Sequence, residues 1–225
     1  MIRTNPRTKR LRVAKSMRTR DRIGWAALFC AVLCAGLLLT GCGAAPRSKY
    51  YELSVPGGAP TVQASDTQVR LLVAGNLSGW DLYRQEEIVY SRGAEQIGTY
   101  QYHRWVEPPT DMIADVLLRE LRSSGRYLAV QAYRSNTSGD FLIRGRIYDF
   151  KEVDSSSILA RVTFDLEMRN LKTGAIVWTH YYTHDEPVSG KNVPAVVAAF
   201  DQNVQRGVKD AGASLDQYFA SHPVK

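Results

Sequence analysis

Residues 158–169 alternate between apolar and polar side chains, and this pattern constrains the fold of the chain more than any other. The apolar positions are Ile158, Ala160, Val162, Phe164, Leu166 and Met168, and the polar positions are Arg161, Thr163, Asp165, Glu167 and Arg169. In a strand, side chains two residues apart share a face. The pattern therefore predicts a strand with one face on a core and the other in water, which is typical of an antiparallel sheet.

A turn, a second strand and a long helix are expected after this strand. Residues 171–174 have the composition of a hairpin turn with Gly174 at the left-handed position, and residues 175–184 would return as its partner strand. Apolar residues then recur at the helical period, at Val193, Val197, Phe200, Val204, Val208, Ala211, Leu215 and Phe219. With Asn192 as its N-cap, this one-sided helix should lie along the sheet.

The first half of the domain is expected to hold shorter strands and one more helix. Extended segments are predicted at 50–53, 69–74, 87–91, 99–105, 127–133 and 141–152. Pro108 and Pro109 set the start of the helix, Thr110 is its candidate cap and Gly125 ends it. These elements predict an α+β fold, a two-layer sandwich whose largely antiparallel or mixed sheet carries two main helices on one face.

An apolar run near the N-terminus predicts export and lipidation. It covers residues 25–40, follows a basic stretch, and at 16 residues is shorter than the roughly 20 that a membrane-spanning helix needs. A transmembrane or buried helix is the alternative interpretation. The run ends in Leu39, Thr40, Gly41 and Cys42, which resemble a bacterial lipobox. By that resemblance Cys42 receives a diacylglyceryl group and an N-acyl chain, and no other cofactor is expected.

The lipobox divides the chain into three expected parts. Residues 1–41 form the signal peptide, 42–49 a tether and 50–225 a single domain. Translation is expected to start at Met17 rather than Met1, because the segment from Met17 onward already holds a complete signal. No acidic residue follows the cysteine directly. By analogy with lipoprotein sorting in enteric bacteria, this predicts the periplasmic face of the outer membrane.

The basic character of the chain comes from its first 41 residues. The formal net charge is +7, from 29 Lys and Arg and 22 Asp and Glu. Nine of these bases and one acid precede Cys42, so residues 42–225 hold 20 bases and 21 acids. The expected mature domain is nearly neutral, and its charge gives no reason to expect nucleic acid as a partner.

The expected domain shows no residue pattern that predicts catalysis or metal binding. Cys30 and Cys34 leave with the signal peptide, so no free thiol remains as a ligand or nucleophile. His180 and His184 lie on an expected strand, where residues four apart are about 13 Å from each other, too far to share one metal ion. No Gly-x-Ser-x-Gly elbow is present. We therefore expect neither an enzyme nor a metal site.

Aromatic side chains are densest at residues 100–105. Tyr100, Tyr102 and Trp105 lie there together with Arg104. One interpretation is that the tyrosines cover a strand while Trp105 fills the core at the start of the helix. The other is a contact surface, because Tyr, Trp and Arg are enriched at the energetic centres of protein interfaces.

Several motifs together resemble a known family. The lipobox is followed by Tyr-Tyr-x-Leu at 50–53, by Tyr83 ahead of Ile-Val-Tyr at 88–90, and by Tyr-x-Tyr-x-Arg-Trp at 100–105. In this order they resemble the ABC-type transport auxiliary lipoproteins, a group that includes the PqiC-like proteins. The resemblance covers residues 42–225 and implies a mixed sandwich similar to the N-terminal domain of TolB.

The resemblance implies a non-catalytic component of an MCE-type lipid transport system between the inner and outer membranes. Its partners would be an MCE-domain protein and, where one drives the system, an ABC transporter; self-association stays open. By position, the resemblance carries Tyr50, Tyr51, Arg104 and Trp105 over to the expected partner surface. The contact-surface interpretation of residues 100–105 adds Tyr100 and Tyr102 to it. Two alternatives remain, a structural or assembly lipoprotein of the outer membrane and an envelope hydrolase.

Overall fold

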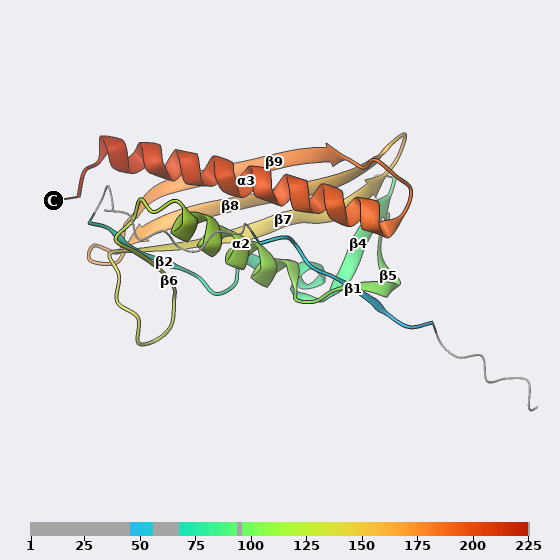
Figure 1. The fold of residues 1–225 in the computed structure, drawn as a ribbon, viewed down its shortest axis with the longest axis horizontal. Coiled ribbons are helices and arrows are strands. Elements are labelled where there is room, and N and C mark those ends of the chain that lie inside the picture. Colours follow the sequence, from blue (N-terminus) through green and yellow to red (C-terminus); the bar gives the residue numbers. More distant parts are fainter. Residues whose placement is uncertain (1–45, 56–67, 94–95, 225) are drawn as a thin grey trace, which may run out of the picture. The chain divides into compact units, whose positions relative to one another are not determined.

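The computed structural model describes residues 46–55, 68–93 and 96–224. The predicted signal peptide, the lipobox residues Leu39, Thr40 and Gly41, and Cys42 lie outside these residues. The chain from Arg47 onward forms one compact unit. In the described part of that unit, nine strands form one mixed sheet beside two α-helices, which confirms the predicted α+β fold (Figure 1).

The elements follow one another in an order close to the one predicted. The strands are β1 (Lys49–Tyr51), β2 (Arg70–Val73), β3 (Ser78–Gly79), β4 (Glu87–Arg92), β5 (Gln96–Trp105), β6 (Ala129–Ala132), β7 (Phe141–Asp154), β8 (Ile158–Asn170) and β9 (Ile176–Pro187). The helices are the short 3-10 helix η1 (Asp81–Arg84), α2 (Pro109–Ser123) and α3 (Val193–Ser221). Among the described residues, no helix is both long enough and apolar enough to cross a membrane.

Strand β7 is the strand on which the sheet is assembled. Along one side it pairs antiparallel with β8 over its whole length, and β9 continues the sheet beyond β8. Along its other side β2, β3 and β4 pair with it in turn, all parallel. The sheet therefore divides into two branches, with β2 and β6 near one end of β7 and β4, β5 and β1 near the other (Figure 1).

A β-bulge in β7 changes which side chains face the core. Ile147 pairs with Phe164, but Asp149 pairs with Thr163, so Tyr148 is the extra residue. Ile147 and Phe150 are both fully buried although they are three residues apart. Because the extra residue shifts the alternation by one, the odd-numbered positions face the core before the bulge and the even-numbered positions face it afterwards.

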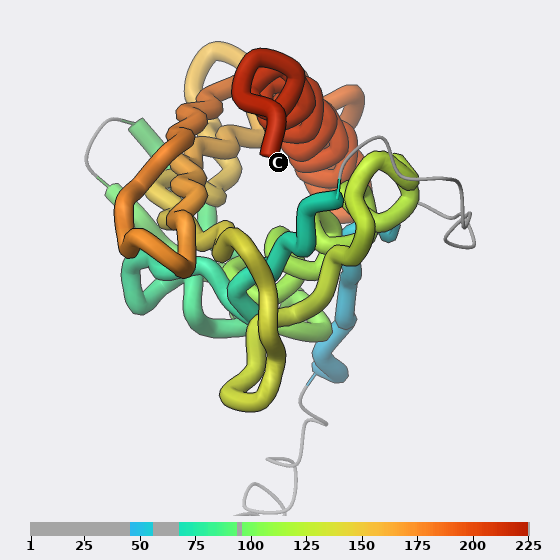
Figure 2. The backbone as a smooth tube through the Cα atoms, turned by 90° about the vertical axis from the view of Figure 1, so that its left-hand side faces the viewer, coloured from blue at the N-terminus to red at the C-terminus, as the bar shows by residue number. Residues whose placement is uncertain are grey.

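Both helices pack on the sheet and on each other. Helix α3 contacts β8 and β9, whereas α2 contacts β2 and β6 and also packs against α3. Figure 2 views the chain nearly along the axis of α3 and shows this helix and strands β8 and β9 as separate layers. The predicted inward positions of β8 at 160, 162, 164, 166 and 168 are all buried. Thr163, which the alternation placed on the face in water, is buried as well at 4% exposed, so that part of the prediction is wrong.

Helix α3 is tied to the sheet by a buried amide as well as by apolar packing. The Asn203 side chain donates hydrogen bonds to the carbonyl oxygens of Ala160 (2.8 Å) and His184 (2.9 Å), one on β8 and one on β9. Its oxygen accepts a hydrogen bond from the Tyr182 hydroxyl at 2.7 Å. One turn further along, a Cβ at Gly207 would lie 2.7 Å from the Tyr182 ring, so only glycine allows this close approach.

The predicted turn and cap residues are largely confirmed. Gly125 and Gly174 both have positive φ, at 66° and 74°, as expected for the end of a helix and for a hairpin turn. The Asn192 side chain accepts a hydrogen bond from the Ala195 amide at 3.0 Å and caps α3. Thr110 is not the cap of α2, because the helix begins one residue earlier and Thr110 is buried within it.

Two features of the structure were absent from the sequence-based prediction. The buried face of α3 includes Val196, which the predicted stripe omitted, while Val197 of that stripe packs against the core and is partly exposed. The second feature is that β2 lies between β6 and β7 in the sheet, so the two strands predicted at 127–133 and 141–152 do not pair with each other. Sequence order alone does not show that an earlier strand is inserted between two later ones.

Truncating Phe164 should destabilise the domain. Its ring is fully buried, and its centroid lies 5.2 Å from that of Tyr182, next to Gly207. Phe164→Ala should lower the free energy of unfolding by about 3–5 kcal/mol, measured by chemical denaturation. Thr179→Ala, on the exposed face of β9, is the control and should change it by less than about 0.5 kcal/mol. Equal effects would contradict the register of β8.

Candidate functional site

The sheet brings the predicted partner-binding residues together at one edge. Strand β1 pairs parallel with β5, so that Tyr50 lies opposite Arg104 and Tyr51 opposite Trp105. Tyr102 lies on the same stretch of β5 and is half-buried. Because β1 pairs with β5, residues about 50 positions apart in the chain form one region. Strand β1 is the last strand of its branch, so this region lies at the edge of the sheet.

Aromatic rings pack against one another in this region. Tyr51 and His103 stack with centroids 5.7 Å apart, and the Tyr51 hydroxyl lies 2.9 Å from Nδ1 of His103. Tyr100 makes edge contacts with His103 at 5.8 Å and with Tyr90 at 5.0 Å. We call these four residues the aromatic cluster. Tyr51 and Tyr100 were among the predicted contact residues, whereas Tyr90 and His103 were not.

A buried carboxylate lies beneath the aromatic cluster. Glu152 on β7 is only 4% exposed and accepts a hydrogen bond from the Tyr100 hydroxyl at 2.8 Å. Burial raises the pKa of Glu152, and the hydrogen bond from Tyr100 opposes this shift. Burial, followed by the contact with Glu152, also raises the pKa of Tyr100. The sequence analysis missed Glu152 because position 152 faces inward only as a result of the bulge at Tyr148.

Arg104 and Trp105, two of the residues predicted to contact a partner, have structural roles in the fold. Nη1 of Arg104 forms an ion pair with Oε1 of Glu87 at 2.8 Å, across the β4–β5 pair. Trp105 is fully buried and packs against Phe150 and Phe200 at 5.5 Å and 5.7 Å. We therefore remove Trp105 from the predicted contact surface, because a side chain with no exposed area cannot touch a partner.

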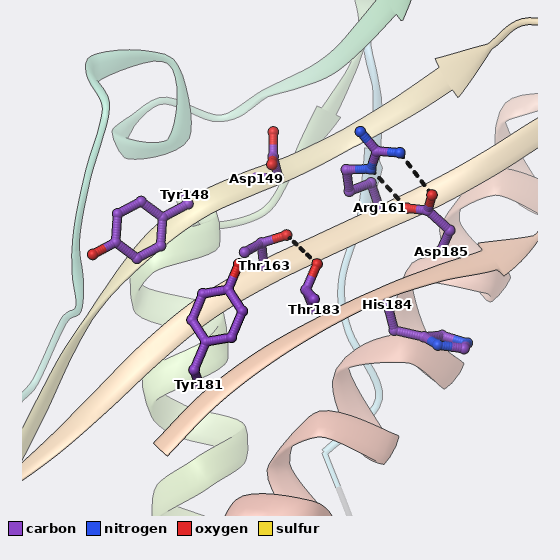
Figure 3. Close-up of a pocket in the computed structure, with 8 residues that line it drawn as sticks. All are labelled: Tyr148, Asp149, Arg161, Thr163, Tyr181, Thr183, His184 and Asp185. Atoms are coloured by element: carbon purple, nitrogen blue, oxygen red, sulfur yellow. Dashed lines mark hydrogen bonds and ion pairs between the residues drawn. The ribbon is translucent and has the colours of Figure 1, made fainter. Parts of the chain in front are cut away.

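A second candidate site is an open groove on the outer face of β7, β8 and β9, of about 710 Å³ (Figure 3). Arg161 donates two hydrogen bonds to Asp185, both at 2.7 Å, and the hydroxyls of Thr163 and Thr183 lie 2.9 Å apart. The Arg161 guanidinium lowers the pKa of Asp185. Tyr148, Asp149, Tyr181 and His184 complete the lining.

Two pairs of groups in this outer groove contact each other across the strands, Arg161 with Asp185 and Thr163 with Thr183. The ring of His184 points away from the other lining residues in Figure 3, and its Nε2 lies 3.3 Å from Glu186. The second predicted strand histidine, His180, lies 3.3 Å from Asp210 on α3, and burial lowers its pKa. No group of three His, Cys, Asp or Glu side chains among the described residues is placed to hold a metal ion.

Removing the charge of Glu152 should stabilise the domain at neutral pH. Because the pKa of Glu152 is raised in the folded state, its ionised form lowers stability as the pH rises above the unfolded value of about 4.3. Glu152→Gln should therefore raise the free energy of unfolding at pH 7, and this gain should disappear at pH 3.5. Denaturation at both pH values tests it, with the exposed Glu86→Gln as control. A loss of stability at pH 7 would show that the surroundings favour the ionised form.

Comparisons with known proteins identify the family and the fold. A family model described as "ABC-type transport auxiliary lipoprotein component" matches residues 51–211. The crystal structure of a Xanthomonas campestris protein of family DUF330 is similar, with a TM-score of 0.65 and 20% identity, over 75% of this chain and 98% of that one. A crystal structure of an uncharacterized protein has a TM-score of 0.59 and 11% identity, over 76% and 99%. No curated protein matches the sequence.

Proposed function

The chain belongs to the ABC-type transport auxiliary lipoprotein family, and we propose that it is a non-catalytic component of an MCE-type lipid transport system. In this proposal the domain binds an MCE-domain protein that carries lipid between the inner and outer membranes, in some systems driven by an ABC transporter. The family description supports the roles of transport component and lipoprotein. The MCE partner is our extension from the family resemblance that the motifs at 50–53 and 100–105 carry.

The proposed anchor is the lipid on Cys42, in the periplasmic face of the outer membrane. The family description names a lipoprotein, and the compact unit begins at Arg47, shortly after this cysteine. Three acyl chains, at roughly 0.8 kcal/mol per buried methylene, would make attachment effectively permanent. A tethered domain meets its partner at a high effective concentration, so a small contact surface would be sufficient.

The single observation that carries the proposed contact is the exposed edge formed by β1 and β5. Tyr50 is 59% exposed on the last strand of this branch, opposite Arg104. Neighbouring Tyr51 and Tyr102 are partly exposed, and the buried Trp105, opposite Tyr51 in the register, fixes the end of β5 to the core. A rigid aromatic side chain on an anchored strand loses little conformational entropy on binding, which favours a contact role.

The pairing of side chains in the outer groove also supports a non-catalytic function, although less directly than the exposed edge of β1 and β5 supports the contact. Arg161 pairs there with Asp185 and Thr163 with Thr183, and the histidine points away from the rest of the lining. General acid–base catalysis needs a titratable group within hydrogen-bond reach of a reacting atom. We propose on this basis that the groove is a structural face of the sheet.

Removing the Tyr50 ring should weaken capture of the MCE-domain protein. In envelopes solubilised with detergent, Tyr50→Ala should reduce its co-purification by roughly five- to thirty-fold, the effect of losing about 1–2 kcal/mol at a contact. The matched control is Tyr181→Ala, which removes a ring that is 63% exposed in the outer groove. The reverse result, with Tyr181 essential and Tyr50 dispensable, would move the contact to the outer groove. Both variants should melt at the wild-type temperature.

Changing the proposed lipidated residue tests the anchor. Cys42→Ser should abolish metabolic labelling with a radioactive fatty acid and leave an unprocessed or soluble protein, because serine provides no thiol for the diacylglyceryl group. Cys34→Ser, within the expected signal peptide, is the control and should leave labelling unchanged. Normal labelling of the Cys42 variant would contradict the lipobox assignment, and fractionation of the wild type with the inner membrane would contradict the proposed location.

A further inference from the structure

A small apolar groove lies at the end of β1, beside the proposed contact edge. Its floor consists of three buried side chains, Leu53 after β1 and Met112 and Val116 on α2. Its walls are Val55 and Val106, which are 40% and 45% exposed. We call this the β1–α2 groove. The apolar surface that meets water here is mainly that of the two valines, so an apolar group placed between them removes this surface from water and is stabilised.

The size of the β1–α2 groove favours side chains over a separate small molecule. Its volume is about 160 Å³. Pockets for small-molecule ligands are typically about 300–1,000 Å³ and enclose most of the ligand. A single apolar side chain projecting from a longer segment fits the smaller volume, while the rest of the segment lies across the rim.

The rim of the β1–α2 groove is acidic. Glu52, Glu107 and Asp115 line it, all three are exposed, and no Lys or Arg is among the lining residues. Among the described parts of the chain, none of the three carboxylates forms an ion pair. Three like charges around an apolar floor attract a cationic partner, which relieves their mutual repulsion and is steered toward the site.

The groove is continuous with the edge that carries Tyr50. The amide of Val106 donates a hydrogen bond to the Tyr51 carbonyl at 2.8 Å, so the chain leaving β5 is joined to β1 at the groove. The amide of Ser54 donates to Asp201 of α3 at 2.7 Å and holds the segment after β1 in place. The apolar floor, the acidic rim and the exposed tyrosine thus belong to one hydrogen-bonded region.

We propose that the β1–α2 groove binds a basic amphipathic segment of the transport partner, with one apolar side chain held between Val55 and Val106. Flanking Lys or Arg residues of that segment pair with Glu52, Glu107 and Asp115. The location and chemistry of the site follow from the groove itself, whereas the identity of the partner rests on the proposed function. The groove thus defines the kind of sequence that the partner presents.

Site-specific photocrosslinking in the intact lipoprotein tests this proposal. A benzophenone amino acid at Val106 should capture the MCE-domain protein in envelopes, and mass spectrometry should place the crosslink in a segment with Lys or Arg beside an apolar residue. The matched control position is Leu128, which is 43% exposed but does not line the groove. A crosslink from Val106 to an acidic or uncharged segment, or to a second copy of this chain, would overturn the proposal.

Neutralising the rim tests the role of charge. Glu107→Gln with Asp115→Asn should lower the yield of the Val106 crosslink roughly two- to tenfold at low salt, and added salt should reduce the wild-type yield toward the same level. The control pair is Asp81→Asn with Glu120→Gln, which removes two carboxylates that do not line the groove. Equal yields for the rim pair and wild type at low salt would overturn the charge assignment.

The outcomes separate this proposal from the proposed function. If the MCE-domain protein co-purifies with the wild type but is never captured from Val106, the groove assignment is wrong and the transport function stands. If no MCE-domain protein is recovered by co-purification or from Val106, the proposed function is wrong and this inference falls with it.

Discussion

The packing of α3 along the inner face of β8 and β9 is the interaction on which the rest of the structure depends. Asn203 satisfies carbonyl groups on both strands from within the core, and Gly207 allows the helix to approach the Tyr182 ring. A buried amide of this kind is favourable only when all its groups are paired, so it specifies one position of the helix on the sheet. Helix α3 covers the inner face of β8 and β9, and the outer groove lies on the opposite face of these strands.

The same packing holds the proposed contact edge in place. Phe200 of α3 stacks on Phe150 of β7 at 4.4 Å, and Trp105 of β5 packs against both rings. In β5, Trp105 therefore lies in the core, and Arg104, the residue just before it, lies at the surface. Because β1 pairs with this anchored strand, the exposed Tyr50 and the β1–α2 groove are presented on a supported part of the fold rather than on a free loop.

The sequence predicted local features well and non-local ones poorly. The alternation in β8, the positive φ of Gly174 and the Asn192 cap follow from chemistry within a few residues, and all three are confirmed. The pairing of β7 with three successive short strands could not be predicted, because it depends on contacts between distant segments. The buried Glu152 was missed for a related reason, since one bulge residue reverses the facing of every later position in β7.

The central claim is that the partner binds at the end of the sheet formed by β1 and β5. Hydrogen–deuterium exchange of the domain, alone and in complex with the purified MCE-domain protein, tests this most directly. On binding, amide exchange should become slower at residues 49–55 and 100–107 and stay unchanged in β9. Protection confined to β9 and the outer groove, with none at β1, would contradict this claim.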